Sequence, residues 1–409
     1  MGLFQQLRKH LFYPLILRQA GDAGLLRWLR QFEQSQHFSS DQLHDLQQTR
    51  LRFQLAHAYQ NCPGYRERFQ SVGLTLSDLQ NLSLDQITML PQLSKADLQE
   101  QCHQFVAEDW PSTDLISNQT GGSTGTPVPF YLSHERRRSR VAATWRHNRW
   151  AGWDIGDRAA YLWGAPQDSP ALTWRARLRR CLMGSSLWLC TEHVTEEKLL
   201  SFHQQLHQFR PRIIQAYARS LLLYAHYVEK AGLHPYSPNS VVISAEGLTS
   251  EERELVERVI GCPVYNRYGC REVSVIASEC SAKLGLHVMA EGLYVEIVQG
   301  NQPAAPGQTG EILVTDLLNH AMPLIRYRIG DMGRWAEGPC TCGRALPRIK
   351  QIEGRVTDFL VGHDGRLVSG VFLATYVVAQ RPSLGQVQIH QRKPGELCYR
   401  ICPGGDFVK

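Results

Sequence analysis

A short run of hydroxyl residues and glycines is the part of this sequence best suited to chemistry. The run is Thr120-Gly121-Gly122-Ser123-Thr124-Gly125-Thr126-Pro127, and apolar segments flank it at residues 115–116 and 128–131. Glycines let backbone N–H groups approach a ligand closely, and the hydroxyls add donors, so the loop suits a phosphate chain. The common P-loop needs a lysine after its last glycine, but Thr126 follows Gly125, and the flanks read as strands. A Gly/Thr hairpin without a ligand is the alternative.

A second candidate is Tyr265-Asn266-Arg267-Tyr268-Gly269-Cys270-Arg271-Glu272. It contains an expected strand end and a Tyr-Gly turn, and open α/β sheets bind ligands at such strand ends. Glu272 could there hold Mg²⁺ beside the phosphates of a nucleotide. The alternative is a surface glutamate in an ordinary salt bridge.

Two further candidate motifs follow, one ending Ile329-Gly330-Asp331, in a turn after an expected strand, and one at Glu353-Gly354-Arg355, ahead of Asp358. A carboxylate such as that of Asp331 offers two acceptor oxygens, which suit both hydroxyls of a ribose. An aspartate in an ordinary turn and a charged turn between two domains are the alternatives.

Four residues have the composition of a structural zinc site. Cys280 and His287 are separated by six residues, and Cys340 and Cys342 form a tight C-x-C pair. Three thiolates and one imidazole make a Cys₃His set, which binds Zn²⁺ tetrahedrally. The alternative is four ordinary residues on two loops.

The elements that must position these residues alternate between strand and helix from about residue 113 to 350. We expect strands at 159–163, 213–217, 241–244 and 264–266, and helices at 196–209, 221–231 and 251–260. This spacing favours βαβ units with a buried, mostly parallel sheet. Antiparallel strands are expected afterwards, at 293–298, 311–315 and 324–328.

The two ends of the chain have different patterns. The first hundred residues read as helical, with a capping box at Ser39/Gln42 and a helix cap at Ser94, followed by Asp97 in the acidic first turn. Apolar residues at 25–29 predict an amphipathic helix docked on the body, and reversible membrane contact is the alternative. Near the C-terminus we expect a hairpin (359–361 with 366–368), a helix (371–379) and two strands (387–391 and 397–401).

Composition narrows the class of protein. The chain has 409 residues, of which 43% are hydrophobic and 20% charged, as in ordinary globular proteins. The net charge of +6 is small and dispersed, so we expect no nucleic-acid partner. Eleven scattered cysteines in a long chain indicate a reducing compartment, the cytoplasm. The arginine runs at 136–138 and 175–180 are predicted to be solvated helix faces, the alternative being contact with CoA phosphates or an acidic carrier protein.

In this order, the motifs resemble the adenylate-forming superfamily and, within it, the phenylacetate–CoA ligase family, including members linked to capsular polysaccharide biosynthesis. The resemblance runs from Leu55-Ala56-His57-Ala58 to Asp358. It implies an α/β adenylate-forming fold with a large multi-sheet N-terminal domain and a small, incomplete α+β C-terminal domain. The implied units are a helical region at 1–112, a main domain that binds ATP and acid at 113–353, and a partial C-terminal domain at 354–409.

The resemblance also assigns roles to residues. Glu272, with Mg²⁺, and Arg355, near the ribose and the domain hinge, would be the catalytic groups. Trp163, Gly164, Tyr217 and Ala245 are candidate walls of the acyl pocket by family position. The metal site at the four Cys/His positions is implied as well. The residues that would bind ATP are Thr120, Gly121, Gly122, Ser123, Thr124 and Gly125 at the phosphates, Ser244, Ala245, Glu246, Gly247, Tyr268 and Gly269 at the adenine, and Asp331 at the ribose.

The implied reaction converts a small carboxylic acid and ATP into an acyl-adenylate, and CoA then accepts the acyl group. An amine acceptor in polysaccharide biosynthesis and an inactive nucleotide-binding scaffold are the alternatives. Arg271 stands where the superfamily has a hydroxyl residue, and neither Lys393 nor Lys409 has the context of the family's catalytic lysine. The sequence therefore suggests either a fragment or a poor adenylating enzyme. We expect a monomer or a homodimer.

Overall fold

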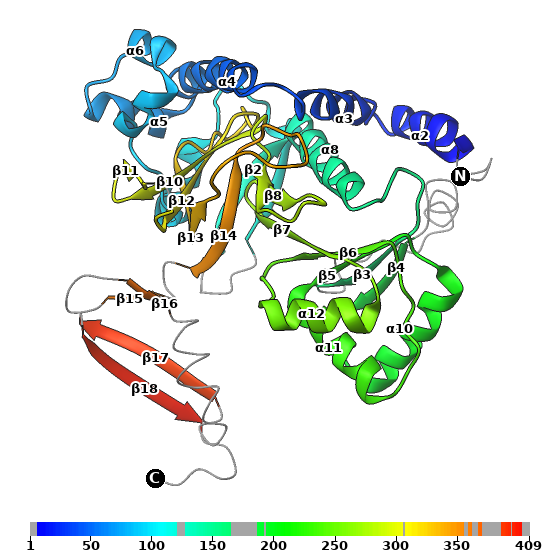
Figure 1. Cartoon of the computed structure of the whole chain (residues 1–409). Coiled ribbons are helices and arrows are strands. Elements are labelled where there is room, and N and C mark those ends of the chain that lie inside the picture. Colours follow the sequence, from blue (N-terminus) through cyan, green and yellow to red (C-terminus); the bar gives the residue numbers. More distant parts are fainter. Residues whose placement is uncertain are drawn as a thin grey trace.

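The framework of the molecule is a long mixed β-sheet. The computed structural model describes residues 6–120, 127–164, 186–191, 194–305, 307–355, 359–361, 367–369, 386–393 and 395–402. Within these residues the sheet has twelve strands, and helices lie on both of its sides (Figure 1).

One half of the sheet is parallel, as the alternation of strands and helices predicts. Its strands, in spatial order, are β4 (Ser186–Cys190), β3 (Ala159–Trp163), β5 (Ile213–Tyr217), β6 (Ser240–Ser244) and β7 (Val264–Cys270). Side chains alternate between the two faces of a strand, so Leu162, Ala216 and Ile243 share one buried face. That face is covered by α10 (Glu196–Phe209), α11 (Ala218–Lys230) and α12 (Ser250–Ile260) (Figure 1).

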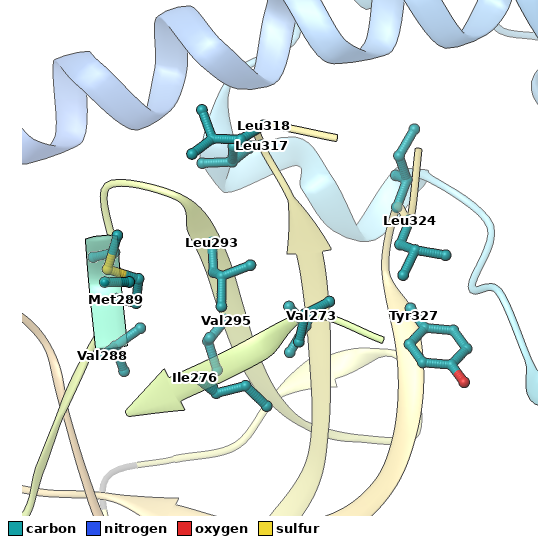
Figure 2. Packing of buried hydrophobic residues seen from close by; sticks show 14 of the residues in the cluster. Val273, Ile276, Val288, Met289, Leu293, Val295, Leu317, Leu318, Leu324 and Tyr327 are labelled. Carbon is teal, nitrogen blue, oxygen red and sulfur yellow. The ribbon is translucent and has the colours of Figure 1, made fainter. Parts of the chain in front are cut away.

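The other half is antiparallel and joins the first where β7 pairs with β8 (Ser274–Glu279). The remaining strands, in spatial order, are β9 (Leu286–Val288), β14 (Arg348–Arg355), β13 (Tyr327–Trp335), β12 (Gly310–Asp316), β10 (Leu293–Gln299) and β11 (Gln302–Pro303). Figure 2 shows Val273, Ile276, Val295 and Tyr327 gathered around these strands in the largest buried apolar cluster. The predicted strands at 293–298 and 311–315 are thus confirmed to within a residue or so at their ends.

Helices of the N-terminal region pack over this core, and their starts are encoded locally. The predicted capping box forms at Ser39 with Gln42, and the predicted cap Ser94 forms a second capping box with Asp97. The buried Leu25 and Leu29 dock α3 on the body, which confirms the predicted amphipathic helix. No helix among the described residues has the length and apolar content to cross a bilayer. The elements are η1 (Arg8–Phe12), α2 (Tyr13–Gln19), α3 (Gly24–Ser35), α4 (Ser40–Asn61), α5 (Pro63–Ser71), α6 (Leu76–Asn81), η2 (Leu84–Met89), α7 (Lys95–Gln101), η3 (Cys102–Phe105) and η4 (Ser112–Asp114).

A buried arginine fixes the beginning of β13. The predicted strand at 324–328 is wrong at its start, because Arg326 has a φ of 47° and the strand begins only at Tyr327. The Arg326 guanidinium is buried and donates to both carboxylate oxygens of Glu296, at 3.0–3.2 Å. It also donates to the Leu90 carbonyl (2.7 Å) and the Asn301 side-chain oxygen (2.7 Å). One side chain therefore joins the N-terminal region to β10 and to the β10–β11 turn.

The chain segment after η2 then runs beside β13. Leu93 donates its N–H to the Arg326 carbonyl (3.1 Å) and accepts from the Arg328 N–H (2.9 Å). Leu93 and Tyr327 form a parallel bridge. This pairing brings Lys95, the first residue of α7, to the same strand.

The arginine run at 136–138 is not the solvated face that we predicted. Arg136 in α8 (His134–Trp150) is buried, and its Nε donates to Asp316 at 2.7 Å. Arg137 and Arg138 pair instead with Asp22 near the surface. The prediction was wrong for Arg136 because its partner lies on a distant strand. The run at 175–180 lies outside the described residues.

Among the described residues, three two-stranded hairpins pair outside the main sheet. β1 (Leu115–Gln119) pairs with β2 (Pro129–Ser133), which confirms strands on both sides of the hydroxyl-rich loop. Near the C-terminus, β15 (Phe359–Val361) pairs with β16 (Leu367–Ser369), and β17 (Gln386–Lys393) pairs with β18 (Glu396–Cys402), also as predicted. The predicted helix at 371–379 lies outside the described residues. The division into units at 1–112, 113–353 and 354–409 stays a prediction.

The Arg326 contacts lead to a stability prediction. We expect Arg326→Met to lower the free energy of unfolding by about 3–5 kcal/mol, because breaking a buried ion pair leaves one charge uncompensated. Burial already raises the pKa of Glu296, and that carboxylate would lose its partner. Urea unfolding followed by tryptophan fluorescence measures the change.

Arg328 provides a matched control, since it lies two residues further along β13. Its side chain is 45% exposed and pairs with Glu311. Arg328→Met should therefore cost less than about 1 kcal/mol. Equal losses in the two variants would contradict the anchoring role of Arg326.

Candidate active site

Three residues from three strands meet at one point of the sheet. Tyr268 of β7 donates its hydroxyl to Oδ2 of Asp331 at 2.8 Å. Arg355 of β14 lies directly across from Asp331 in the antiparallel register, and its Nε is 3.5 Å from Oδ1. The sequence motifs that contain these residues are thus brought together.

The surroundings of Asp331 differ from the turns that the sequence suggested. Asp331 lies inside β13 rather than in a turn, and Gly330 before it has a φ of 88°. Likewise, Glu353-Gly354-Arg355 belongs to β14 and is not a turn between domains. β13 and β14 remain paired here although their register shifts twice, and the residue types alone do not reveal this pairing.

Burial and charge act against each other on Asp331. Burial raises the pKa of its carboxyl group, while the Tyr268 hydrogen bond and the cations Arg355 and Lys95 oppose that rise. Burial and the adjacent Asp331 raise the pKa of Tyr268 well above its ordinary value, so its hydroxyl stays a donor. The result is a carboxylate with one fixed donor and cations nearby.

Glu272 lies next to this group. It is buried, and the hydroxyl of Tyr327 donates to its Oε1 at 2.9 Å. Glu272 also acts electrostatically on Asp331, raising its pKa. Tyr327 was not singled out from the sequence, where it reads only as an aromatic strand residue.

The hydroxyl-rich loop has a closed base. Thr120 donates its N–H to the Val128 carbonyl (3.0 Å), and its hydroxyl oxygen accepts from the Val128 N–H (2.9 Å). These two bonds close the hairpin between β1 and β2. Gly121, Gly122, Ser123, Thr124 and Gly125 lie outside the described residues, so their predicted phosphate contacts stay predictions.

The predicted adenine segment follows β6, the neighbour of β7 in the sheet. Ser244 ends β6, and Ala245 adopts a left-handed φ of 72°, which is uncommon for alanine. Glu246 is exposed and pairs with Arg219 (3.2 Å), while Gly247 is exposed. Gly269 follows Tyr268 within β7, and a Cβ there would lie 2.3 Å from the Ser274 carbonyl oxygen. Only glycine fits at that position, so the approach of β7 and β8 requires Gly269. The Tyr-Gly turn expected from the sequence is wrong, because both residues lie within β7.

A lysine beside Asp331 was missed by the sequence analysis. Lys95 Nζ lies 3.7 Å from the position that a Cβ on Gly330 would take. Its charge also lowers the pKa of Asp331. In the sequence, Lys95 reads only as the first residue of a capped helix, so no local signal marked it.

Aromatic residues of the neighbouring strands β3, β4 and β5 stack in pairs. Trp163 of β3 and Tyr217 of β5 stack with their ring centres 4.4 Å apart. Tyr161 and Trp188 stack in the same way at 4.2 Å. The first pair contains two of the predicted walls of the acyl pocket, and that role stays a prediction.

The four predicted metal ligands do converge. The ligand atoms of Cys280, His287, Cys340 and Cys342 all lie within 4.8 Å of one another. The Sγ atoms of Cys280 and Cys340 are 3.7 Å apart, close to the roughly 3.8 Å that tetrahedral Zn–S bonds of about 2.3 Å require. Cys342 Sγ is 3.3 Å from His287 Nε2.

The surroundings of these ligands suit a metal. His287 Nδ1 is 3.2 Å from the Leu346 carbonyl, and an N–H there leaves Nε2 as the free ligand atom. Burial lowers the pKa of His287 to about 4, so the imidazole is neutral as a ligand must be. Burial raises the pKa of Cys280 to about 12, so this thiol is protonated in the metal-free protein and would have to lose its proton on binding a metal.

Curated proteins include similar sequences, although no model of a protein family matches this chain. Phenylacetate–coenzyme A ligases of Pseudomonas putida and Escherichia coli K12 are each 28% identical to it, over 331 and 332 residues. Both alignments cover 79% of this chain and 73% of the relative. Protein CapK of Staphylococcus aureus is 24% identical over 303 residues, covering 72% of this chain and 65% of CapK.

Solved structures show the same architecture. A 2-hydroxyisobutyryl-CoA ligase in the postadenylation state, in complex with 2-HIB-AMP, superposes with a TM-score of 0.72 at 19% identity. The match covers 90% of this chain and 80% of that one. An open conformation with 2-HIB-AMP and CoA gives a TM-score of 0.69, again at 19% identity, and covers 87% and 83%. The predicted fold class is confirmed. The resemblance read from the motifs is confirmed too, since this chain is similar in sequence to the phenylacetate–coenzyme A ligases and shares the fold of the 2-hydroxyisobutyryl-CoA ligase.

Proposed function

We propose that this protein uses ATP to activate a small carboxylic acid as its acyl-adenylate and then transfers the acyl group to CoA. The observation that carries the proposal is the meeting of Tyr268, Asp331 and Arg355 beside Glu272. Relatives named as phenylacetate–coenzyme A ligases support it, as do similar ligase structures that hold an acyl-AMP and CoA.

In the first step, a carboxylate oxygen of the acid attacks the α-phosphorus of ATP and pyrophosphate leaves. Asp331 accepts hydrogen bonds from the ribose hydroxyls, and Tyr268 lies against the adenine while it orients Asp331. Glu272 would hold Mg²⁺, which neutralises phosphate charge when bound. In the second step, the CoA thiolate attacks the acyl carbonyl and AMP leaves.

Lys95 supplies a cation at the α-phosphate in this proposal. The support is its position beside Gly330 and Asp331, where the ribose end of the nucleotide would lie. Negative charge builds on the phosphate oxygens as the acid attacks, and a fixed cation stabilises it most at that moment. Arg355 offsets the charge of Asp331 from the other side.

Pyrophosphate exchange that depends on an added carboxylic acid tests the first step. Release of AMP on adding CoA tests the second, and release only with an amine would favour an amine acceptor instead. If no acid in a broad panel supports exchange, the protein is a nucleotide-binding scaffold or lacks this activity. We expect the protein to act in the cytoplasm, as a monomer or a homodimer.

Asp331 gives the first prediction. We expect Asp331→Ala to raise the KM for ATP by roughly ten- to a hundredfold, because hydrogen bonds to a charged group contribute about 1.5–3 kcal/mol. The fold should be unaffected or slightly stabilised. Burial raises the pKa of Asp331 in the folded protein above its value in the unfolded chain. Above the folded pKa, the ionised carboxylate therefore lowers the free energy of unfolding, and below the unfolded pKa this loss disappears.

Thermal unfolding at pH 7 and ATP kinetics on the same preparation measure the two effects. Glu311→Ala is the control, since this carboxylate lies on the adjacent strand β12 and pairs with Arg328. An unchanged KM for ATP in the Asp331 variant would refute its ribose-binding role.

Lys95 gives the second prediction. Lys95→Ala should lower the rate of acid-dependent pyrophosphate exchange by roughly a hundredfold, as loss of one transition-state donor does elsewhere. The KM for the acid should change little, and Lys95→Arg should restore part of the rate. Lys230→Ala, a change at an exposed lysine paired with Glu196, is the control. A Lys95→Ala variant with the normal rate would remove Lys95 from the mechanism.

We further propose that Cys280, His287, Cys340 and Cys342 bind a structural Zn²⁺. The support is the donor set and its spacing, which match tetrahedral zinc. All four positions of the metal would be taken by protein ligands, so the metal would stabilise the fold and take no part in the reaction.

Metal analysis tests this proposal. We expect about one equivalent of zinc per chain, since structural sites bind tightly, and removal by a chelator at elevated temperature should lower the unfolding midpoint. Cys342→Ser should reduce the zinc content, whereas Cys102→Ser, at a half-buried thiol outside the cluster, should not. Less than about half an equivalent in the wild type would contradict a structural site.

A further inference from the structure

Arg267 is a buried cation without a carboxylate partner. It lies on β7 directly before Tyr268, and only 6% of it is exposed. Its Nη1 donates to the side-chain oxygen of Gln215 (3.1 Å), its Nη2 donates to that of Asn148, and its Nε has no partner. In the part of the chain that the structure describes, Arg267 forms no ion pair.

Three other buried arginines are paired with acids, while Arg348 donates to three backbone carbonyls. Arg136 meets Asp316, Arg146 meets Glu291, and Arg326 meets Glu296. A buried charge is strongly unfavourable unless a counter-charge accompanies it. Amide oxygens, the partners of Arg267, carry no net charge.

Nothing nearby among the described residues removes this charge. Burial lowers the pKa of Arg267 to about 10, which still leaves it protonated at neutral pH. His147 lies near it, and burial followed by the charges of Arg146 and Arg267 lowers the pKa of that histidine further. His147 Nδ1 is also buried and has no partner. Two nitrogen atoms in a cationic environment are thus left without acceptors.

The position of Arg267 in the sheet places this charge beside the aromatic pair. Tyr217 pairs with Ser244, and the β6–β7 register, which pairs Ile243 with Asn266, brings Arg267 next to Ser244. Residues in one row of parallel strands share a face, so Arg267 is on the face of Tyr217 and Trp163. This face is opposite to the one that α10, α11 and α12 cover.

The Arg267 guanidinium extends across β6 to β5, the strand that carries Tyr217. Its partner Gln215 precedes Tyr217 by two residues on the same face, and Gln215 Nε2 donates to the Tyr161 hydroxyl at 3.2 Å. Tyr161, Gln215 and Arg267 therefore form a hydrogen-bonded row on the same face of the sheet as the stacked rings of Trp163 and Tyr217. Aromatic rings suit a planar or apolar ligand body, and a cation beyond them suits an anion at the far end of that ligand.

We propose that Arg267 is the counter-ion for a second carboxylate on the acid that this protein activates. The substrate class is then a small dicarboxylic acid, in which one carboxylate reacts at the strand ends beside Tyr268 and Asp331. The other carboxylate lies beside the guanidinium and supplies the counter-charge that Arg267 lacks among the described residues. This inference rests on the proposed ligase function.

Matched pairs of acids test the proposal by pyrophosphate exchange. The pairs are 4-carboxyphenylacetate against 4-carbamoylphenylacetate, and glutarate against glutaramate, with phenylacetate as an unsubstituted reference. Within each pair the shape is kept and only the distal charge is lost. We expect kcat/KM in the wild type to favour the diacid at least about tenfold in one or both pairs, since truncating a buried charge pair has effects of this size or more.

Two variants separate recognition from a merely structural role. Arg267→Met should abolish the preference by raising the KM for the diacid, with little change for the amide, and Arg267→Lys should keep part of it. Thermal unfolding of both variants checks the fold. A structural role would instead lower activity equally with both members of a pair.

Other outcomes overturn the inference in distinguishable ways. A wild type that prefers the amide in both pairs, or an Arg267→Met variant that keeps the preference for the diacid, refutes the role of Arg267 and leaves the ligase proposal standing. Absence of exchange with all five acids and with a broader panel refutes the ligase proposal, and this inference with it.

Discussion

The buried ion pair between Arg326 and Glu296 is the interaction on which the site geometry depends. Its guanidinium also holds carbonyl oxygens of the N-terminal region and the side chain of Asn301. A buried charge this well surrounded tolerates little displacement, because every lost contact exposes an uncompensated group. The start of β13 is therefore fixed, and Asp331 lies only a few residues further along. The same contacts hold the segment that delivers Lys95 to β13.

The cysteine and histidine cluster lies beyond the other end of this strand. Cys340 and Cys342 lie on the connection from β13 to β14, while Cys280 and His287 lie on the β8–β9 hairpin. A metal bound there would tie the two hairpins together. Asp331 and Arg355 would then occupy a pair of strands held by charge at one end and by coordination at the other. A site built on such strands can keep two charged groups in register without help from the nucleotide.

Buried charge serves two purposes in this fold. Arg136 and Arg146 have acidic partners and join α8 to distant parts of the chain, so their role is structural. Arg267 has similar burial but only neutral acceptors. The difference separates charges whose partners are built into the protein from one whose partner can come from a ligand. Asp331 lies between these two cases. Burial raises the pKa of its carboxyl group, as for an unpaired charge, but the nearby cations Arg355 and Lys95 oppose that rise.

The sequence by itself determined the elements whose causes are local. The strands at 159–163 and 213–217, the helix at 196–209 and the capping boxes at Ser39 and Ser94 follow from periodicity and from contacts within a few residues. The order of the motifs also identified the fold, and residue chemistry identified the four candidate metal ligands, which the structure brings together.

Only the tertiary structure decided which charges are buried and which residues meet. Three adjacent arginines at 136–138 are indistinguishable in sequence, yet Arg136 alone among them is buried. It forms an ion pair with Asp316, which lies on a strand 180 residues further along the chain. Distant partners likewise decide the left-handed backbone conformation of Arg326, the position of Asp331 within a strand and the approach of Lys95 to that strand. Local patterns set secondary structure because the contacts are short in sequence. The site is set by register and ion pairs between segments that only the complete fold brings together.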